Sequence, residues 1–243
     1  MNVLLIVPTY NERENLPILL DCILERYNYR VLVVDDQSPD GTGAVADEYA
    51  RRYPDRIEVM HRTGPRGLGR SYIDGMRHGL AGSADVICQL DADFSHDPKY
   101  LPDMVAATNQ YDLVIGSRYL HGISVVNWPL RRVILSTFAN WYVRTITRLT
   151  VRDCTAGFRA WRRDALATIP IGGMLSEGYA FVVEMTFEAA RRGYRIGEVP
   201  IIFVERRDGV SKMSTRVLAE SMLMPWRLVW RGLWRAGSGG ARS

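Results

Sequence analysis

The sequence has little of what marks a disulfide-rich, zinc-binding, membrane-spanning or nucleic-acid-binding protein. Its three cysteines, Cys22, Cys88 and Cys154, are far apart and form no Cys-x-x-Cys pair. This argues against a disulfide framework or a cysteine zinc site and favours a reducing cytosol. The longest uncharged apolar stretch, 133–143, is too short to span a bilayer. The net charge of +4 suits anionic substrates or an anionic membrane surface but is too mild to imply nucleic acid.

The first 115 or so residues alternate between short β-branched runs and helical patterns. Residues 1–8 have no basic n-region, so we expect a strand there and no signal peptide. The predicted strands are Val3–Val7, Val31–Val34, Ile57–Met60, Val86–Leu90 and Leu113–Ile115, and the predicted helices are Glu14–Arg26, Thr42–Arg52, Leu68–Leu80 and Pro98–Asn109. This alternation predicts an α/β fold with a mostly parallel sheet flanked by helices, in which ligands bind at the carboxyl ends of the strands.

The most informative strand end is the acidic triplet Asp91-Ala92-Asp93, which follows the apolar run 86–90. On an extended backbone, residues i and i+2 point to the same side, so Asp91 and Asp93 would face one cation together. Carboxylate oxygens suit Mg²⁺ or Mn²⁺ better than zinc. Asp-x-Asp is also a common turn motif, and for the triplet taken alone this structural interpretation is the stronger one.

A second acidic pair, Asp35-Asp36, closes the second predicted strand, where dinucleotide-binding folds hold a ribose hydroxyl. A dinucleotide site also needs Gly-x-Gly-x-x-Gly in the first turn. This chain has Pro-Thr-Tyr-Asn-Glu at 8–12 instead, and its glycine cluster at 64–69 comes too late. The first turn therefore argues against a dehydrogenase.

Six ordered motifs then carry a specific resemblance. They are Pro-Thr-Tyr-Asn-Glu (8–12), Val-Val-Asp-Asp-x-Ser-Pro-Asp-Gly-Thr (33–42), Asp-Ala-Asp-Phe-Ser-His (91–96), Gly-Ser-Arg-Tyr (116–119), Gly-Phe-Arg (157–159) and Arg-x-x-Gly-x-Ser-Lys (206–212). From Val3 to about Ser214 the chain resembles the inverting glycosyltransferases of family 2, in particular the polyprenol-phosphate (dolichol-phosphate) mannosyltransferases. The resemblance implies a GT-A fold and transfer of mannose from GDP-mannose to a polyprenyl phosphate, with inversion.

The resemblance also implies roles for the matched residues. The base and ribose pocket would be lined by Pro8, Tyr10, Glu12, Val34 and Asp36. The diphosphate and its Mg²⁺ or Mn²⁺ would lie at Asp91, Ala92 and Asp93, with Ser95 as a poorer third ligand where some members have Gln. Phosphate groups would be contacted by Arg118, Arg206 and Lys212, and the acceptor phosphate by Arg131 and Ser211. Asp91, Asp93 and Arg118 would be the catalytic residues. The acceptor phosphate is already anionic near neutral pH, so no general base is needed.

A lipid acceptor requires membrane contact, and two stretches are candidates for it. In the segment 213–236, Trp226, Trp230 and Trp234 form one helical stripe beside arginines, a composition typical of an interfacial helix. Such a stripe can also pack on the core. The segment from Trp128 to Arg148 mixes aromatic, aliphatic and basic residues.

We therefore expect a catalytic domain at 1–212, an amphipathic helical segment at 213–236 and a disordered tail at 237–243. The expected location is peripheral, on the cytoplasmic face of a membrane. A separate small membrane-anchoring protein is a further partner to consider, since the sequence encodes no transmembrane helix.

Two alternatives stay open at this stage. The first is a related enzyme that transfers glucose or another sugar from a UDP-sugar, because the motifs do not specify the donor. The second is a non-catalytic nucleotide-binding protein of the membrane surface. The presence of both acids together with Arg206 and Lys212 favours an active enzyme.

Overall fold

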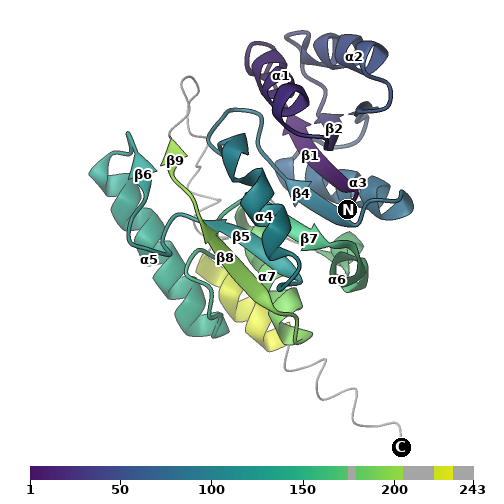
Figure 1. Ribbon diagram of the computed structural model, residues 1–243. Coiled ribbons are helices and arrows are strands. Elements are labelled where there is room, and N and C mark those ends of the chain that lie inside the picture. The colour runs from purple at the N-terminus through teal and green to yellow at the C-terminus, as the bar shows by residue number, and fades with distance from the viewer. Residues whose placement is uncertain (175–178, 205–221, 232–243) are drawn as a thin grey trace, which may run out of the picture.

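The computed structural model describes residues 1–174, 179–204 and 222–231. Its main feature is a sheet of seven strands in the order β3-β2-β1-β4-β7-β5-β8 (Figure 1). The strands are β1 (Val3–Thr9), β2 (Arg30–Asp35), β3 (Ile57–His61), β4 (Val86–Gln89), β5 (Leu113–Ser117), β7 (Arg159–Arg162) and β8 (Ile196–Pro200). The five strands predicted from the sequence correspond to β1 to β5, with ends shifted by one or two residues.

The sheet is parallel except for one strand. β1, β2, β3 and β4 pair in parallel, as do β5 and β8. β7 lies between β4 and β5 and is antiparallel to both, so β4 and β5 point the same way. The prediction of a mostly parallel sheet is confirmed, and β7 is the strand that the sequence analysis did not find.

Helices cover both faces of the sheet because each strand alternates its apolar side chains between them. In β1, Val3, Leu5 and Val7 belong to the core under α1 (Asn15–Arg26), α2 (Thr42–Arg52) and α4 (Leu101–Ala107). Leu4 and Ile6 belong to the core on the other face, under α3 (Leu68–Ala81), α6 (Arg163–Thr168), α7 (Tyr179–Arg191) and the helical residues 222–231. Figure 1 shows α4 in front of the sheet and α7 with the yellow helix behind it.

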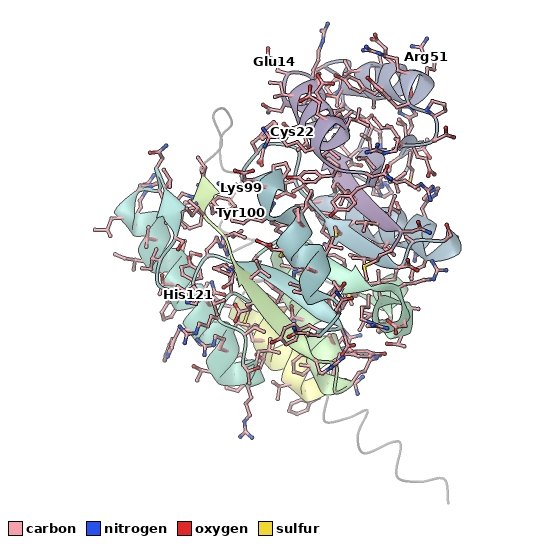
Figure 2. All side chains as sticks on the ribbon, viewed as in Figure 1. Glu14, Cys22, Arg51, Lys99, Tyr100 and His121 are labelled. Carbon is pink, nitrogen blue, oxygen red and sulfur yellow. The ribbon has the colours of Figure 1, made fainter. Side chains whose placement is uncertain are left out.

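A smaller unit flanks the β5–β8 end of the sheet. Strands β6 (Val125–Val126) and β9 (Phe203–Val204) form a two-stranded parallel ribbon. The long helix α5 (Leu130–Thr147) follows β6 and leaves most of its surface exposed. Two 3₁₀ turns, η1 (Pro98–Tyr100) and η2 (Ile171–Gly173), complete the described elements. The Tyr100 hydroxyl, labelled in Figure 2, accepts a hydrogen bond from the Ile202 backbone N–H at 3.0 Å, which ties η1 to the segment before β9.

The predicted C-terminal helical segment is described only at 222–231, where it is helical. Met224 and Leu228 pack into the core, whereas Trp226 and Trp230 are 59% and 67% exposed. For these two tryptophans the alternative of packing on the core is therefore wrong. Trp234 and the predicted disordered tail lie outside the described residues. Within the described ranges, none of the helices combines the length and the apolar character needed to cross a bilayer.

Candidate active site

Polar residues gather at one edge of the sheet, where β1, β2, β4 and β5 end. Because these strands point the same way, their carboxyl ends meet at the same edge. β1 and β2 end side by side at Thr9 and Asp35, and the Thr9 hydroxyl donates a hydrogen bond to Asp35 Oδ1 at 3.3 Å. β4 ends at Gln89 and β5 at Ser117. This edge therefore carries the acidic triplet and Arg118.

The acidic triplet at 91–93 does not continue β4 as an extended chain. The strand ends at Gln89, the chain turns, and Phe94 adopts a φ of 59°. The expectation that strand alternation turns both carboxylates to one side was therefore wrong. Asp93 Oδ1 accepts a hydrogen bond from the Ser95 backbone N–H at 3.0 Å, a turn that Asp commonly stabilises. A turn at the strand end, and not the strand itself, orients the two acids.

Asp91 is approached from two sides. The Tyr72 hydroxyl, from α3, donates a hydrogen bond to Asp91 Oδ1 at 2.7 Å. His96 Nδ1 lies 3.6 Å from Asp91 Oδ2. Burial raises the pKa of Tyr72 well above its usual value, and the Asp91 carboxylate adds to this shift, so the phenol stays protonated. The Asp91 side chain nevertheless keeps 24% of its surface exposed, which leaves it accessible to a ligand.

His96 is buried among aromatic rings beside the acids. Its ring stacks on Phe158 at 5.3 Å between centroids and meets the edge of Phe203 at 5.5 Å. Burial lowers the pKa of His96, despite the opposing effect of the nearby carboxylates, so the imidazole is neutral at neutral pH. Among the described residues its Nδ1 has no hydrogen-bond partner.

The donor set of the triplet fits an oxygen-ligated divalent cation. Mg²⁺ is usually held by one or two protein carboxylates and takes its other ligands from water and substrate phosphates. Asp91 and Asp93 supply two such carboxylates, and Ser95 is buried next to them. In the three described ranges, His, Cys, Asp and Glu side chains form no group of three or more that could hold a metal. A cation held by the two acids would complete its shell with phosphate and water oxygens.

Asp36, predicted to accept a hydrogen bond from ribose or base, has internal partners in the structure. Its Oδ1 forms an ion pair with Arg62, and both side chains are almost fully buried. Its Oδ2 accepts a hydrogen bond from the Gly67 backbone N–H at 2.8 Å. Arg62 also pairs with Asp74 at 2.8 Å. These contacts hold the loop that leads into α3, and the contact of Asp36 with the nucleoside stays a prediction.

Two other residues of the predicted nucleoside pocket lie just beyond β1. Arg66 Nη1 donates a hydrogen bond to the Tyr10 hydroxyl at 2.9 Å, and the guanidinium lies 4.9 Å from the ring centre. Glu12 Oε2 accepts a hydrogen bond from Asn15 Nδ2 at 2.8 Å. Tyr10 is half-buried and Arg66 exposed, so this pair lies at the surface of the edge.

Pro8 and Val34 face each other within the sheet as paired residues of β1 and β2. The Val34 side chain is fully buried and packs toward Gly75 of α3. The side chain belongs to the core, and a place for Val34 in the nucleoside pocket stays a prediction. Pro8 is likewise buried inside its strand.

Arg118 forms a buried ion pair with Asp153. Its Nε and Nη2 each donate to a different carboxylate oxygen at 2.7 Å, and its backbone N–H adds a bond at 3.0 Å. The guanidinium also lies about 5.5 Å from the ring centres of Trp128 and Phe203. Burial opposes ionisation of Asp153, but Arg118 outweighs it and lowers the pKa of the carboxyl. This bidentate pairing orients the guanidinium at the carboxyl edge, and the direct role of Arg118 toward a phosphate stays a prediction.

Of the remaining predicted phosphate ligands, one lies on the surface and three lie outside the described residues. Arg131 lies in the first turn of α5 and is exposed. Arg206, Ser211 and Lys212 lie outside the described residues.

Three residues at this edge were given no role in the sequence analysis, although Arg159 is part of the Gly-Phe-Arg motif. Tyr72 and Arg62 bond directly to predicted site acids, as described above. Arg159 is fully buried and donates to the backbone carbonyls of Cys154, Ala156 and Val182 and to the Thr186 hydroxyl. The sequence offered one signal, the buried helical spacing of Tyr72 and Met76, but such spacing is ordinary for core residues.

Comparison with known proteins places this geometry in a family. Solved structures of glucosyl-3-phosphoglycerate synthase from Mycobacterium tuberculosis share the fold. The one described in complex with Mn²⁺, uridine-diphosphate and glucosyl-3-phosphoglycerate has a TM-score of 0.65 at 17% identity, over 97% of this chain and 80% of that one. At this identity the likeness establishes the fold alone.

Two curated relatives are much more similar in sequence. A polyprenol monophosphomannose synthase from Mycolicibacterium smegmatis is 47% identical over 90% of this chain and 83% of its own length. An undecaprenyl-phosphate mannosyltransferase from Micrococcus luteus is 47% identical over 96% of this chain and 98% of its own length. The model of the family described as glycosyl transferase family 2 matches residues 4–169. With its acids at the carboxyl edge of a GT-A sheet, this chain belongs to glycosyl transferase family 2.

Proposed function

We propose that this glycosyltransferase moves mannose from GDP-mannose to a polyprenyl monophosphate and so makes a lipid-linked mannose. The observation that carries the proposal is the near full-length similarity to an undecaprenyl-phosphate mannosyltransferase, 47% identical over 96% of this chain. The site supports it chemically, because two carboxylates at the carboxyl edge suit a nucleoside diphosphate and its cation. GDP-mannose as the donor follows from the motif resemblance.

The donor diphosphate would lie at Asp91 and Asp93. A divalent cation bound there supplies Lewis-acid stabilisation of the negative charge that grows on the departing GDP. Solved structures that share the fold include one with Mn²⁺ and uridine-diphosphate-glucose, which supports the use of such a cation. The Tyr72 hydrogen bond and the turn at Ser95 hold the two acids in place before substrate arrives.

The acceptor supplies its own nucleophile. A phosphate monoester carries a charge of about −1.5 to −2 at pH 7, so one of its oxygens can attack the anomeric carbon without a protein base. The new bond joins that oxygen to the anomeric carbon, and the bond from that carbon to the diphosphate breaks with its electron pair leaving on GDP. The protein must bring two anions together, which requires basic residues near the site. Arg131, Arg206 and Lys212 are the proposed cations, with Ser211 beside the acceptor phosphate.

An apolar surface beside the site supports a lipid acceptor. It is formed by α5 and the helix 222–231, which contact each other: the Trp226 indole N–H donates to the Tyr142 hydroxyl at 3.0 Å, and that hydroxyl donates to the Met222 carbonyl at 2.8 Å. We call this the aromatic surface; its exposed members are Leu130, Ile134, Phe138, Trp141, Leu223, Trp226 and Trp230. Exposed tryptophans and aliphatic side chains beside arginines are typical of a membrane interface. We propose that this surface holds the protein on the cytoplasmic face of a membrane.

A donor assay with the full chain tests this function. The purified protein is incubated with vesicles containing undecaprenyl phosphate or dolichyl phosphate, Mg²⁺ or Mn²⁺, and labelled GDP-mannose, UDP-glucose or UDP-galactose. The expected result is label in the organic phase from GDP-mannose only, dependent on both the metal and the phosphorylated lipid. Vesicles with unphosphorylated polyprenol are the control.

Each other outcome contradicts part of the proposal. Transfer from a UDP-sugar but not from GDP-mannose would replace the donor while keeping the lipid acceptor. Nucleotide binding without any transfer would favour a non-catalytic binding protein. Undiminished transfer in the presence of a metal chelator would remove the cation from the proposal.

A further inference from the structure

Tyr72 is one of the largest fully buried side chains of the protein, and its one side-chain polar atom contacts the active-site edge. It lies on α3, and its hydroxyl donates a hydrogen bond to Asp91 Oδ1 at 2.7 Å. A buried phenol needs a hydrogen-bond partner, and most buried tyrosines find one in the core. Here the partner is a partly exposed carboxylate in the turn that would hold the diphosphate.

The start of α3 is fixed by the Asp36 network. Asp36 binds Arg62 through one oxygen and the backbone N–H of Gly67 through the other. Gly67 precedes Leu68, the first residue of α3, and has a φ of +156°, which disfavours other residues there. The ion pair and the glycine therefore set where α3 begins. Tyr72 is the fifth residue of the helix, close to the carboxyl edge.

Two glycines then bring α3 close to the sheet. A Cβ on Gly75 would lie 2.5 Å from a side-chain carbon of Ile6, and one on Gly79 would lie 3.0 Å from Ile87. Gly75 and Gly79 lie one and two turns beyond Tyr72 on the same helix face. With α3 this close to β1 and β4, the Tyr72 hydroxyl reaches Asp91, which follows the end of β4.

The other oxygen of Asp91, Oδ2, has His96 and Gly157 as neighbours. His96 Nδ1 lies 3.6 Å from Asp91 Oδ2, beyond a good hydrogen bond. A Cβ on Gly157 would lie 3.8 Å from the same oxygen, which is ordinary van der Waals contact and not a polar one. The hydrogen bond from Tyr72 is therefore the short contact that sets the rotation of the carboxylate about its last bond.

We infer that Tyr72 is a positioning residue: its hydroxyl fixes the Asp91 carboxylate so that the second oxygen faces the bound cation and diphosphate. The inference rests on the proposed function. Partners that orient a metal-binding carboxylate typically contribute between about 10- and 100-fold to metal affinity or activity. A residue with only a packing role would not show this effect when its ring is retained.

The test compares two variants that each remove one phenol oxygen. Tyr72→Phe keeps the ring and deletes the bond to Asp91. Tyr49→Phe is the matched control, since the Tyr49 hydroxyl, also on a buried residue, donates to Asp21 at 2.8 Å away from the site. Mn²⁺ binding to the purified full chain, alone and with GDP, is measured by the loss of the free-ion electron paramagnetic resonance signal. The melting temperature of each variant is recorded by circular dichroism.

The expected result is an Mn²⁺ dissociation constant raised about 10-fold or more in Tyr72→Phe and changed less than about 2-fold in Tyr49→Phe. In an Asp91→Asn background, Tyr72→Phe should have no further effect on Mn²⁺ binding, because its only route is through Asp91. An unchanged Mn²⁺ affinity in Tyr72→Phe, or an equal further loss in the Asp91→Asn background, overturns the inference while the proposed function stands. A wild-type protein that binds neither Mn²⁺ nor GDP and transfers no mannose overturns both.

Discussion

The buried pair of Arg118 and Asp153 offers a sharp test of the electrostatics of this site. Asp153 is fully buried and accepts three bonds from Arg118, two of them from the guanidinium at 2.7 Å. Replacing Asp153 by Asn keeps the shape but removes the charge. The buried Arg118 guanidinium then loses the charge of the carboxylate that it contacts through two nitrogens. Breaking a buried pair in this way costs about 3–5 kcal/mol of unfolding free energy, a large part of the roughly 5–15 kcal/mol that a typical domain has.

The assay is urea denaturation followed by circular dichroism, with the free energy of unfolding extrapolated to water. Asp164→Asn is the control, because Asp164 pairs with Arg162 at 2.6 Å on the surface. An exposed pair of this kind contributes only about 0–1 kcal/mol. In the Asp153→Asn background, Arg118→Met should recover part of the loss, since an apolar side chain has no charge to bury.

The pH dependence of the same pair has a definite sign. The folded-state pKa of Asp153 is lowered, so its stabilisation is fully present above the unfolded pKa of about 3.9 and is lost as the pH falls through the lower folded value. The difference in stability between wild type and Asp153→Asn should therefore stay constant from pH 7 to 5 and shrink in more acidic solution. A loss no larger than that of Asp164→Asn at pH 7 would refute the view that Arg118 is committed to Asp153.

Three further predictions concern the acids, the packing of α3 and the aromatic surface. Asp93→Ala should weaken Mn²⁺ binding and mannose transfer by more than about 100-fold, beyond the usual effect of an outer-shell change, as measured by calorimetry and the donor assay. Gly75→Ala should lower the unfolding free energy by about 1–3 kcal/mol in urea, because its new carbon would lie 2.5 Å from a β1 side chain. Replacing Trp226 and Trp230 by Ser should weaken binding to anionic vesicles by at least about tenfold in a sedimentation assay, while Ile18→Ser, an exposed site on α1, leaves it unchanged.

The first half of the fold was accessible from the sequence because its signals are local. Each strand from β1 to β4 is a short run of apolar, mostly β-branched residues followed by a helical pattern. Strands joined by such crossover helices point the same way in the sheet. β7 carries no such signal. Its four residues, Arg159–Arg162, include two arginines, and one of them, Arg159, is fully buried and donates a hydrogen bond to the distant backbone carbonyl of Val182. A strand that inserts antiparallel between β4 and β5 depends on pairing that no local pattern records.

For the candidate site, too, the sequence predicted where residues lie but not which residues they contact. The strand pattern correctly placed acids at the carboxyl edge, but it could not tell which charge each one meets. Asp36 and Asp91 illustrate this, because both were predicted to face the nucleotide from similar positions at strand ends. Asp36 is paired with Arg62 and almost fully buried, whereas Asp91 accepts a hydrogen bond from the neutral phenol of Tyr72 and its side chain is 24% exposed. An acid that keeps its access to solvent can bind a cation more readily than one held in a buried ion pair, so the partner of each acid bears on how it can contact a ligand, and no local sequence pattern records that partner.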